Sequence, residues 1–283
     1  MKGLIYPSNI GMTPEQYAEF VVKSTYGDTV SVRKKAKPLN KFGRTANADS
    51  GVATTVSQFQ GTTVVNETFV TTNLIDSIVS SSGSDTMSIT IEGHTIDGSG
   101  NLTFSVQTAT LNGQTEVTLA TPLARANRAY VTPSGTFNST PAALVGNVSV
   151  YDNTAGITSG VPNTAAATKL ILNAGQTQSQ KCQTAISSAD YWFIDSYQYS
   201  ITGAGPNAEV NFQIESRDIA NGGVWRPFGP EISLESGATP TLRGNFEPFR
   251  IVPPNHDLRV IATASAANTE VSAEIEGVLA SIQ

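Results

Sequence analysis

The stretch from Ser88 to Leu119 constrains the fold more than any other part of the chain. Apolar and polar residues alternate there in three runs, and a period of two predicts strands that are buried on one face. Asp97-Gly98 and Asn112-Gly113 separate the runs, and both dipeptides are typical of tight β-hairpin turns. The apolar positions are Met87/Ile89/Ile91, Leu102/Phe104/Val106 and Val117/Leu119. The pattern predicts an antiparallel meander.

The C-terminal half repeats this pattern of short runs separated by Gly, Pro and Asn. Val210-Phe212-Ile214 and Leu258-Val260-Ala262 alternate with polar residues, and Val271-Ala273-Ile275 alternates with glutamates that should form a wet face. Strands at this spacing, without helical patterns between them, indicate sandwiches or jelly rolls rather than βαβ units. We therefore expect an all-β protein of two antiparallel β-sandwich or jelly-roll-like domains, preceded by an extended arm with one short helix.

Charge divides the chain unevenly. Residues 1–46 contain eight basic and three acidic side chains, a charge of +5, whereas the whole chain carries −6, so the remainder carries −11. We predict a basic N-terminal arm over residues 1–46, a first β domain over 47–160 and a second, jelly-roll-like domain over 161–283. The second boundary follows from the aperiodic, Ala- and Thr-rich segment 155–168. Whether the β region is one domain or two stays open.

The arm contains the one convincing helix start. Thr13-Pro14-Glu15-Gln16 offers an N-cap, a proline at the first helical position and a capping-box glutamine, which predicts a helix over about residues 13–23. A helix this short is marginal alone, so its apolar face should dock on a partner. Residues 37–43 are interpreted as an extended linker. The predicted partner-binding residues of the arm are Tyr17, Phe20, Val21, Arg33, Lys34, Lys35 and Lys37.

The partner of the arm is expected to be an acidic protein surface. Nucleic acid is unlikely, because the short basic cluster lacks interleaved aromatic residues and any recognisable binding motif. The chain has no run of about twenty apolar residues that would span a membrane. It also has no signal peptide at its start, so we expect synthesis in the cytosol.

Catalytic and metal-binding patterns are missing from the sequence. Cys182 is the only cysteine, so no internal disulfide can form, and we interpret it as buried and inert. His94 precedes a turn, and His256, beside Asp257, is interpreted as a loop histidine, because adjacent residues rarely form a catalytic pair. Zinc-type spacings and nucleophile motifs do not occur. We expect no catalytic residue, no metal and no cofactor, although a pair of glycosidase carboxylates cannot be recognised from sequence.

Two pairs of residues are candidate contact sites. Arg125 and Arg128 would form a fork for carboxylates at an interface, or else two strand-end arginines in local salt bridges. Tyr191 and Trp192 would stack on a glycan, or else belong to the core and rim of a strand. The sequence leaves both choices open.

Two segments carry a resemblance to a known class of proteins. SDTMSITIEGHTIDGSGNLTFSVQTATLNGQTEVTLATPLARANRAYV, residues 84–131, and NAGQTQSQ, residues 173–180, are similar to virion structural proteins of tailed bacteriophages. The likeness extends over roughly residues 46–283. It implies a non-enzymatic capsid decoration, cement or spike-like accessory protein, commonly a trimer. It transfers no site residues, because the shared positions are turn and strand residues.

These observations favour a virion structural protein that binds the capsid exterior through its arm. A charged content of only 14% suits broad contacts with other subunits. The expected partners are the major capsid protein or other virion proteins and further copies of the chain in a homotrimer, and the expected location is the virion. One alternative is a neck, tail or fibre-base component. The other is a carbohydrate-binding or carbohydrate-cleaving β-sandwich.

Overall fold

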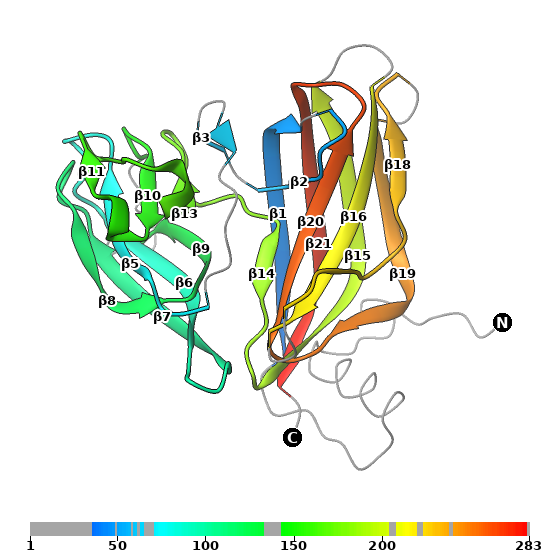
Figure 1. The fold of residues 1–283 in the computed structure, drawn as a ribbon, viewed down its shortest axis with the longest axis horizontal. Helices are drawn as coiled ribbons and strands as arrows, with labels where there is room; N and C mark the ends of the chain where they lie inside the picture. The colour runs from blue at the N-terminus through cyan, green and yellow to red at the C-terminus, as the bar shows by residue number, and fades with distance from the viewer. Residues whose placement is uncertain are drawn as a thin grey trace, which may run out of the picture.

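The computed structural model describes residues 36–48, 50–57, 59–60, 63–64, 71–132, 143–203, 208–219, 223–237 and 240–281. These residues form 21 strands, in antiparallel ladders, and two short 3₁₀ helices. The predicted all-β class is therefore confirmed. The helix predicted over about residues 13–23 lies outside the described residues. The strands build two bodies that lie side by side, each with its own hydrophobic core (Figure 1).

The first of these, which we call the jelly-roll body, is a sandwich of two sheets. One sheet has the order β1-β21-β15-β19, and the other has the order β14-β20-β16-β17, with β2 paired to β20 and β18 paired to β16. Its strands are β1 (Lys37–Ala48), β2 (Thr54–Thr55), β14 (Gln183–Ala185), β15 (Asp190–Gly203), β16 (Glu209–Asp218), β17 (Arg226–Pro227), β18 (Ile232–Glu235), β19 (Thr241–Val252), β20 (His256–Ala264) and β21 (Thr269–Ser281).

The connectivity of this body is that of a jelly roll. β2 pairs with Ala262 and Ile261 of β20, and β14 continues along the same strand from Arg259 to Asp257, so β2 and β14 form one edge in two pieces. We number the strands of this body in chain order and count β2 and β14 together as the second strand and β17 and β18 together as the fifth. The strand order is then 1-8-3-6 in one sheet and 2-7-4-5 in the other. This is the double Greek key of a jelly roll. The other body is inserted into the chain between the two pieces of that edge.

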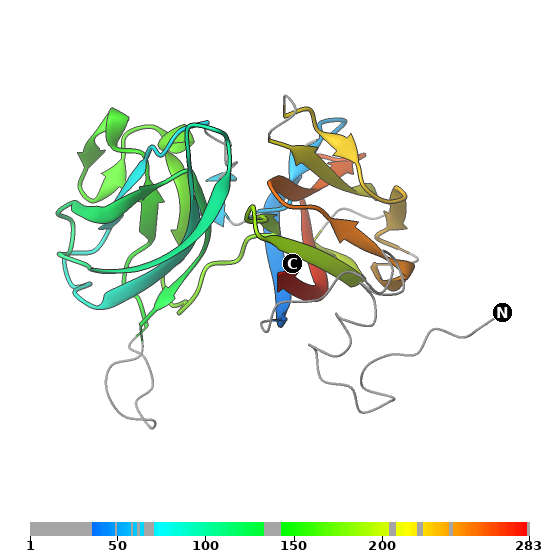
Figure 2. The same ribbon diagram turned by 90° about the horizontal axis from the view of Figure 1, so that it is seen from below.

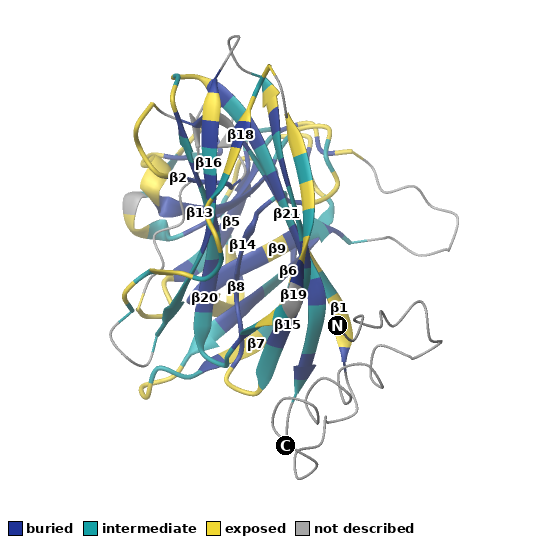
Figure 3. Ribbon diagram, turned by 90° about the vertical axis from the view of Figure 1, so that its right-hand side faces the viewer, coloured by how far each residue is buried: buried dark blue, intermediate teal, exposed yellow. Residues whose placement is uncertain are grey.

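The core of the jelly-roll body follows from alternation along its strands. Phe212 stacks on Tyr199 of the facing sheet with ring centroids 4.7 Å apart, and Val271, Ala273 and Ile275 are all buried. The glutamates that alternate with these last three, Glu270, Glu274 and Glu276, are partly exposed on the outer face, as the alternation predicts. Each fully buried large apolar side chain contributes roughly 1.5–3 kcal/mol to stability. Figure 3 shows buried positions alternating with half-buried and exposed ones along the strands.

The second body, which we call the inserted body, is a smaller sandwich. Its two sheets have the orders β13-β10-β5-β8 and β7-β6-β9, and their facing sides enclose the second core (Figure 2). Its main strands are β5 (Ile75–Ser80), β6 (Ser88–Ile96), β7 (Leu102–Thr110), β8 (Val117–Leu123), β9 (Arg125–Val131), β10 (Val148–Tyr151) and β13 (Thr168–Leu172). Its short elements are η1 (Asn153–Ala155), β11 (Ile157–Thr158), β12 (Val161–Pro162) and η2 (Ala165–Ala167). A separate pair, β3 (Phe59–Gln60) and β4 (Thr63–Val64), contacts β1 of the jelly-roll body.

The predicted meander is half right. β6 and β7 form the expected hairpin, paired from Ser88↔Thr110 to Ile96↔Leu102. After Gly113, which has a φ of 58°, the chain crosses to the other sheet, and β8 pairs with β5 instead of β7. The apolar alternation of β7 is also misleading, since Phe104 and Val106 are 41% and 54% exposed. These two side chains project from the outer face of their sheet, opposite the core that contains Ala109.

The prediction of an extended linker over residues 37–43 is wrong. These residues belong to β1, which pairs with β21 from Lys37↔Leu279 to Ala48↔Thr269. Because β1 and β2 share the core of residues 182–281, the jelly-roll body combines both ends of the described chain. The two bodies therefore do not match the predicted domain ranges 1–46, 47–160 and 161–283. A periodicity argument cannot see that a strand pairs with one more than 200 residues away.

Candidate functional site

Several buried charged side chains lie at the seam between the two bodies. Two ammonium groups cross it to carbonyl oxygens of β9. Lys41 Nζ on β1 donates to the carbonyl of Asn127 at 2.8 Å, and Lys181 Nζ donates to that of Ala126 at 2.6 Å. Both lysines are buried, with 7% and 2% of their surface exposed. The seam is therefore a packed interface rather than a linker.

An ion cluster lies in the same seam. Arg125 of β9 binds Asp257 of β20 through Nε–Oδ1 and Nη2–Oδ2 contacts of 2.7 and 2.9 Å. Arg217 of β16 donates to the same carboxylate from Nε at 2.8 Å. Arg125 and Asp257 are almost completely buried. Two arginines on one carboxylate leave a net positive charge here.

The β6–β7 turn rests on the turn between β19 and β20. Asn255 accepts a hydrogen bond from the backbone N–H of Leu102 at 2.9 Å, and its amide donates to Asn101 Oδ1 at 3.2 Å. Ser188 N–H donates to the Leu102 carbonyl at 2.8 Å. Asn255 has a φ of 55°, a conformation that asparagine tolerates better than most residues. These bonds join loops of the two bodies.

A cavity of about 560 Å³ opens in the seam. We call it the seam cavity. Its walls come from β1, β14, β15 and β21 of the jelly-roll body, from the outer face of β6, β7 and β9, and from the segment 178–181 that returns to the jelly-roll body. The charged residues on its walls are Lys37, Lys41, Glu92, Arg128, Lys181, Asp190 and Glu274. Polar side chains thus line much of a concave space that the two bodies form together.

Burial perturbs two groups on these walls. It lowers the pKa of Lys41 from 10.5 to about 8, and the neighbouring positive charge of Lys181 adds to that effect. Burial, followed by the charge of Arg125, lowers the pKa of His94 to about 3, so this imidazole is neutral at pH 7. The Asn127 amide donates to His94 Nδ1 at 3.0 Å, which leaves the ring proton on Nε2. His94 lies near the end of β6, before the turn to β7, as predicted.

The structure places the predicted arm residues as follows. Tyr17, Phe20, Val21, Arg33, Lys34 and Lys35 lie outside the described residues. Lys37 begins β1, and its Nζ lies 4.7 Å from the centre of the Phe104 ring, against the inserted body. The binding role proposed for these residues stays a prediction, although Lys37 contacts a surface of its own chain.

Arg125 and Arg128 do not form a joint fork. The guanidinium of Arg125 is buried against Asp257, whereas Arg128 is 47% exposed, 3.0 Å from Gln178 Oε1 and 3.9 Å from Glu92. Arg125 lies at an interface between the two bodies of its own chain. Only Arg128 faces the seam cavity.

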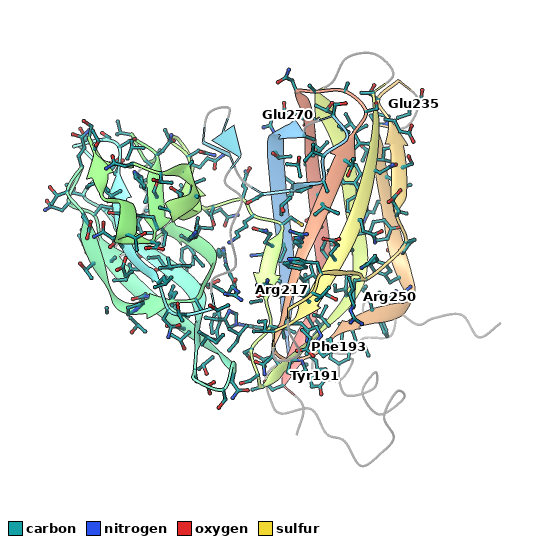
Figure 4. The ribbon with its side chains drawn as sticks, in the orientation of Figure 1. Tyr191, Phe193, Arg217, Glu235, Arg250 and Glu270 are labelled. Carbon is teal, nitrogen blue, oxygen red and sulfur yellow. The ribbon has the colours of Figure 1, made fainter. Side chains whose placement is uncertain are left out.

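The predicted glycan contact fails at Trp192. Its side chain is fully buried in the core of the jelly-roll body, so it is not accessible to a sugar. Tyr191 is half-buried, and it lies with Phe193 at the lower end of the jelly-roll body, opposite Glu270 (Figure 4). Tyr199, from the same aromatic cluster, also belongs to the core.

Two predictions about polar residues have different outcomes. Cys182 is buried, as predicted, and burial raises the pKa of its thiol to about 12. His256 begins β20 instead of lying in a loop, and its Nδ1 is 2.8 Å from the Pro254 carbonyl. Asp257 points to the two arginines, so the His256-Asp257 pair has no shared geometry. Within the described ranges no group of three His, Cys, Asp or Glu side chains is placed to hold a metal.

Sequence reasoning missed Lys41, Lys181 and Asp257. Lys41 is 86 residues from its carbonyl partner, and Asp257 is 132 residues from Arg125. No spacing rule connects residues that far apart. The one available signal was that Lys41 lies on the same face of β1 as Leu39 and Gly43, the face that points inward.

Comparisons with known proteins give little further information. No protein-family model and no curated protein matches the chain. Among solved structures, an IBDV viral particle covers 72% of this chain and 68% of its own at 10% identity and a TM-score of 0.23. The VP2 subviral particle of infectious bursal disease virus covers 93% and 77% at 9% identity and a TM-score of 0.21. The N-terminal CBM22-1-CBM22-2 tandem domain of Paenibacillus barcinonensis Xyn10C covers 89% and 92% at 12% identity and a TM-score of 0.22. These TM-scores are too low to carry an argument about fold or function.

The described part of the chain contains no helix long and apolar enough to cross a membrane.

Proposed function

We propose that the chain is a non-enzymatic structural protein of a virus particle, and more specifically a decoration or cement protein of a tailed bacteriophage. The observation that carries the proposal is the architecture, a jelly roll with a second β-sandwich inserted into one of its edge strands. Jelly rolls build viral capsids and lectins, so the support is by analogy of fold. The resemblance of residues 84–131 to virion proteins points in the same direction.

The packed seam supports a structural role. Buried ion pairs and lysine–carbonyl bonds join the two bodies, so the inserted body is held at a defined angle on the jelly-roll body. A particle protein needs this rigidity, because its contacts with neighbouring subunits depend on fixed geometry. An enzyme would require convergent reactive groups, and the carboxylates on the walls of the seam cavity are bound instead to serine, asparagine or arginine side chains.

The attachment arm in this proposal is residues 1–35. Residues 37–48 belong to the jelly-roll body, so an arm that leaves it for a capsid surface must lie before β1. That segment contains the helix pattern with Tyr17, Phe20 and Val21 and three of the clustered basic residues. Its partner in the proposal is the major capsid protein or another virion protein.

The first experiment tests membership of the particle. Particles purified by density gradient from the organism that encodes the chain are analysed by quantitative mass spectrometry. We expect the chain at a fixed ratio to the major capsid protein, in many copies. A few copies per particle would favour the neck, tail or fibre-base alternative. Absence of the chain from purified particles would contradict the proposal.

The second experiment tests the arm. Full-length protein and a variant lacking residues 1–35 are added to particles without the chain and co-sedimented at low and high salt. We expect the shortened variant to stay folded and to lose binding. Binding by charge should weaken as salt rises, since exposed charges are screened over about 8–10 Å at ordinary ionic strength. Salt-independent binding would assign attachment to the apolar helix face.

The proposed assembly is a homotrimer. Light scattering on the full chain and on the variant lacking residues 1–35 should give a trimer for both if the β bodies hold the subunits together. A monomer in both would assign assembly to the capsid lattice.

The carbohydrate-binding alternative is weakened by the burial of Trp192.

A further inference from the structure

We propose that the seam cavity binds a small oxyanion, a carboxylate or a phosphate, between the ammonium group of Lys41 and the guanidinium of Arg128. This site is independent of whether the chain belongs to a virus particle. It rests on the cavity, on the charges around it and on the partners that those charges already have.

Lys41 brings a positive charge into the cavity without a carboxylate partner. Among the described residues its Nζ makes one hydrogen bond, to the Asn127 carbonyl, which leaves two of its three N–H groups for another acceptor. The side chain is 7% exposed and lines the cavity. A buried ammonium is stabilised by an opposite charge, and a bound oxyanion would supply that charge.

Two of the three acids on the cavity walls are held by neutral side chains. Asp190 accepts from the Ser187 and Ser281 hydroxyls, at 2.5 Å each. Glu274 accepts from the Asn40 amide at 2.6 Å, and Glu92 lies 3.9 Å from Arg128. Within the described residues none of the three lies at ion-pair distance from Lys41. The walls carry four cationic side chains, including Lys41 and Arg128, against these three carboxylates, so the cavity favours an anion over a cation.

Arg128 supplies a second charged donor at the mouth of the cavity. It comes from β9, the strand whose carbonyls receive Lys41 and Lys181, and it is 47% exposed. A guanidinium offers paired donors that match the two oxygens of a carboxylate or phosphate. A volume of about 560 Å³ falls within the range of small-ligand sites, so an organic anion fits as well as inorganic phosphate.

Burial lowers the pKa of Lys41 only to about 8, so the ammonium remains mostly charged at pH 7. An oxyanion beside it would raise this pKa again.

The test is equilibrium dialysis of the full chain at pH 7 with inorganic phosphate and, separately, with citrate. We expect saturable binding of one anion per chain for at least one probe. Preference for citrate would identify a carboxylate ligand, and preference for phosphate a phosphate ligand. Arg128→Gln should weaken binding by roughly tenfold, because it removes a charged hydrogen-bond donor. Lys41→Met should abolish it.

Arg243→Gln is the matched control. It removes one exposed charge from β19, outside the cavity, and should leave binding unchanged. If Lys41→Met does not fold, the binding measured for Arg128→Gln decides the test. Arg128 is exposed and contributes to no core, so this variant should fold. Absence of saturable binding of both probes, or equal binding by the wild type and Arg128→Gln, would overturn the proposal.

Discussion

Arg125 and Asp257 form a bidentate ion pair across the seam between the two bodies, with N–O distances of 2.7 and 2.9 Å. Both side chains are almost fully buried, and 132 residues separate them in the chain. Arg217 binds the same carboxylate from the jelly-roll side. The pair therefore couples the stability of the inserted body to that of the jelly-roll body.

Breaking this pair should destabilise the protein, and the two partners should differ. Asp257→Asn leaves the Arg125 guanidinium buried without its carboxylate and should cost about 4 kcal/mol of the free energy of unfolding. Arg125→Met leaves Asp257 with Arg217, so we expect a smaller loss, about 3 kcal/mol. Urea unfolding followed by circular dichroism measures both. Arg243→Gln, at an exposed ion pair, should cost less than about 1 kcal/mol. A loss as small as this control in Asp257→Asn would show that the seam pair does not contribute.

Lys41 should make stability depend on pH in the alkaline range. Its pKa is about 8 in the folded protein against 10.5 ordinarily, so between these values the unfolded chain binds more protons. The penalty for burying the charged lysine is complete below about pH 8 and is relieved as pH rises toward 10.5. The shift corresponds to about 3 kcal/mol.

The comparison with Lys41→Met isolates this effect from other lysines. The stability of the wild type relative to Lys41→Met should rise from pH 8 to 10.5 and should stay level from pH 6 to 7.5. The charged or titratable groups that act on Lys41 are Lys181, Cys182, Glu92 and Arg128. Parallel pH profiles for the two proteins would mean that Lys41 titrates normally.

Cys182 should resist thiol reagents in the folded protein. The thiol is fully buried and its pKa is raised to about 12, so almost no thiolate forms at pH 8. We expect a chromogenic disulfide reagent to react only as fast as the protein unfolds, and at once in denaturant. Rapid reaction under native conditions would show that β1 opens away from Cys182, whose Sγ lies 3.5 Å from the Lys41 carbonyl.

The two N-terminal truncations should behave differently. Deleting residues 1–35 leaves β1 intact, and the thermal midpoint should change little. Deleting residues 1–46 removes most of the strand that pairs with β21 and also removes Lys41, so the jelly-roll body loses one edge of a sheet. We expect a large fall in the thermal midpoint or loss of folding, measured by circular dichroism. Equal midpoints for both truncations would contradict the strand assignment of β1.

Trp192→Ala tests the core rather than a sugar site. The side chain is fully buried, so its removal should cost about 3–5 kcal/mol of the free energy of unfolding. Tyr191→Ala, at a half-buried position next to it, should cost much less and is the appropriate variant for glycan-binding assays. A stable Trp192→Ala protein would indicate that the tryptophan does not lie in the core.

Local patterns were sufficient where a strand's environment is decided by its own residues. The β6–β7 hairpin, with its turn at Asp97-Gly98, and the alternation of Val271, Ala273 and Ile275 were predicted because side-chain direction has a period of two. The same reasoning failed for Phe104 and Val106, which lie on the outer face of their sheet, beside the seam. Alternation identifies two faces but does not say which one is buried.

The sequence by itself determined the all-β class, several strands and the burial of the single cysteine, because these follow from alternation, turn residues and composition. Tertiary structure decided that β1 completes a sheet with β21, that β2 and β14 share one edge, and that the intervening residues form an inserted body. It also decided that Arg125 meets Asp257 and that Lys41 lies beside a cavity. Pairings over such distances depend on the packing of whole sheets, so no local pattern in the chain encodes them.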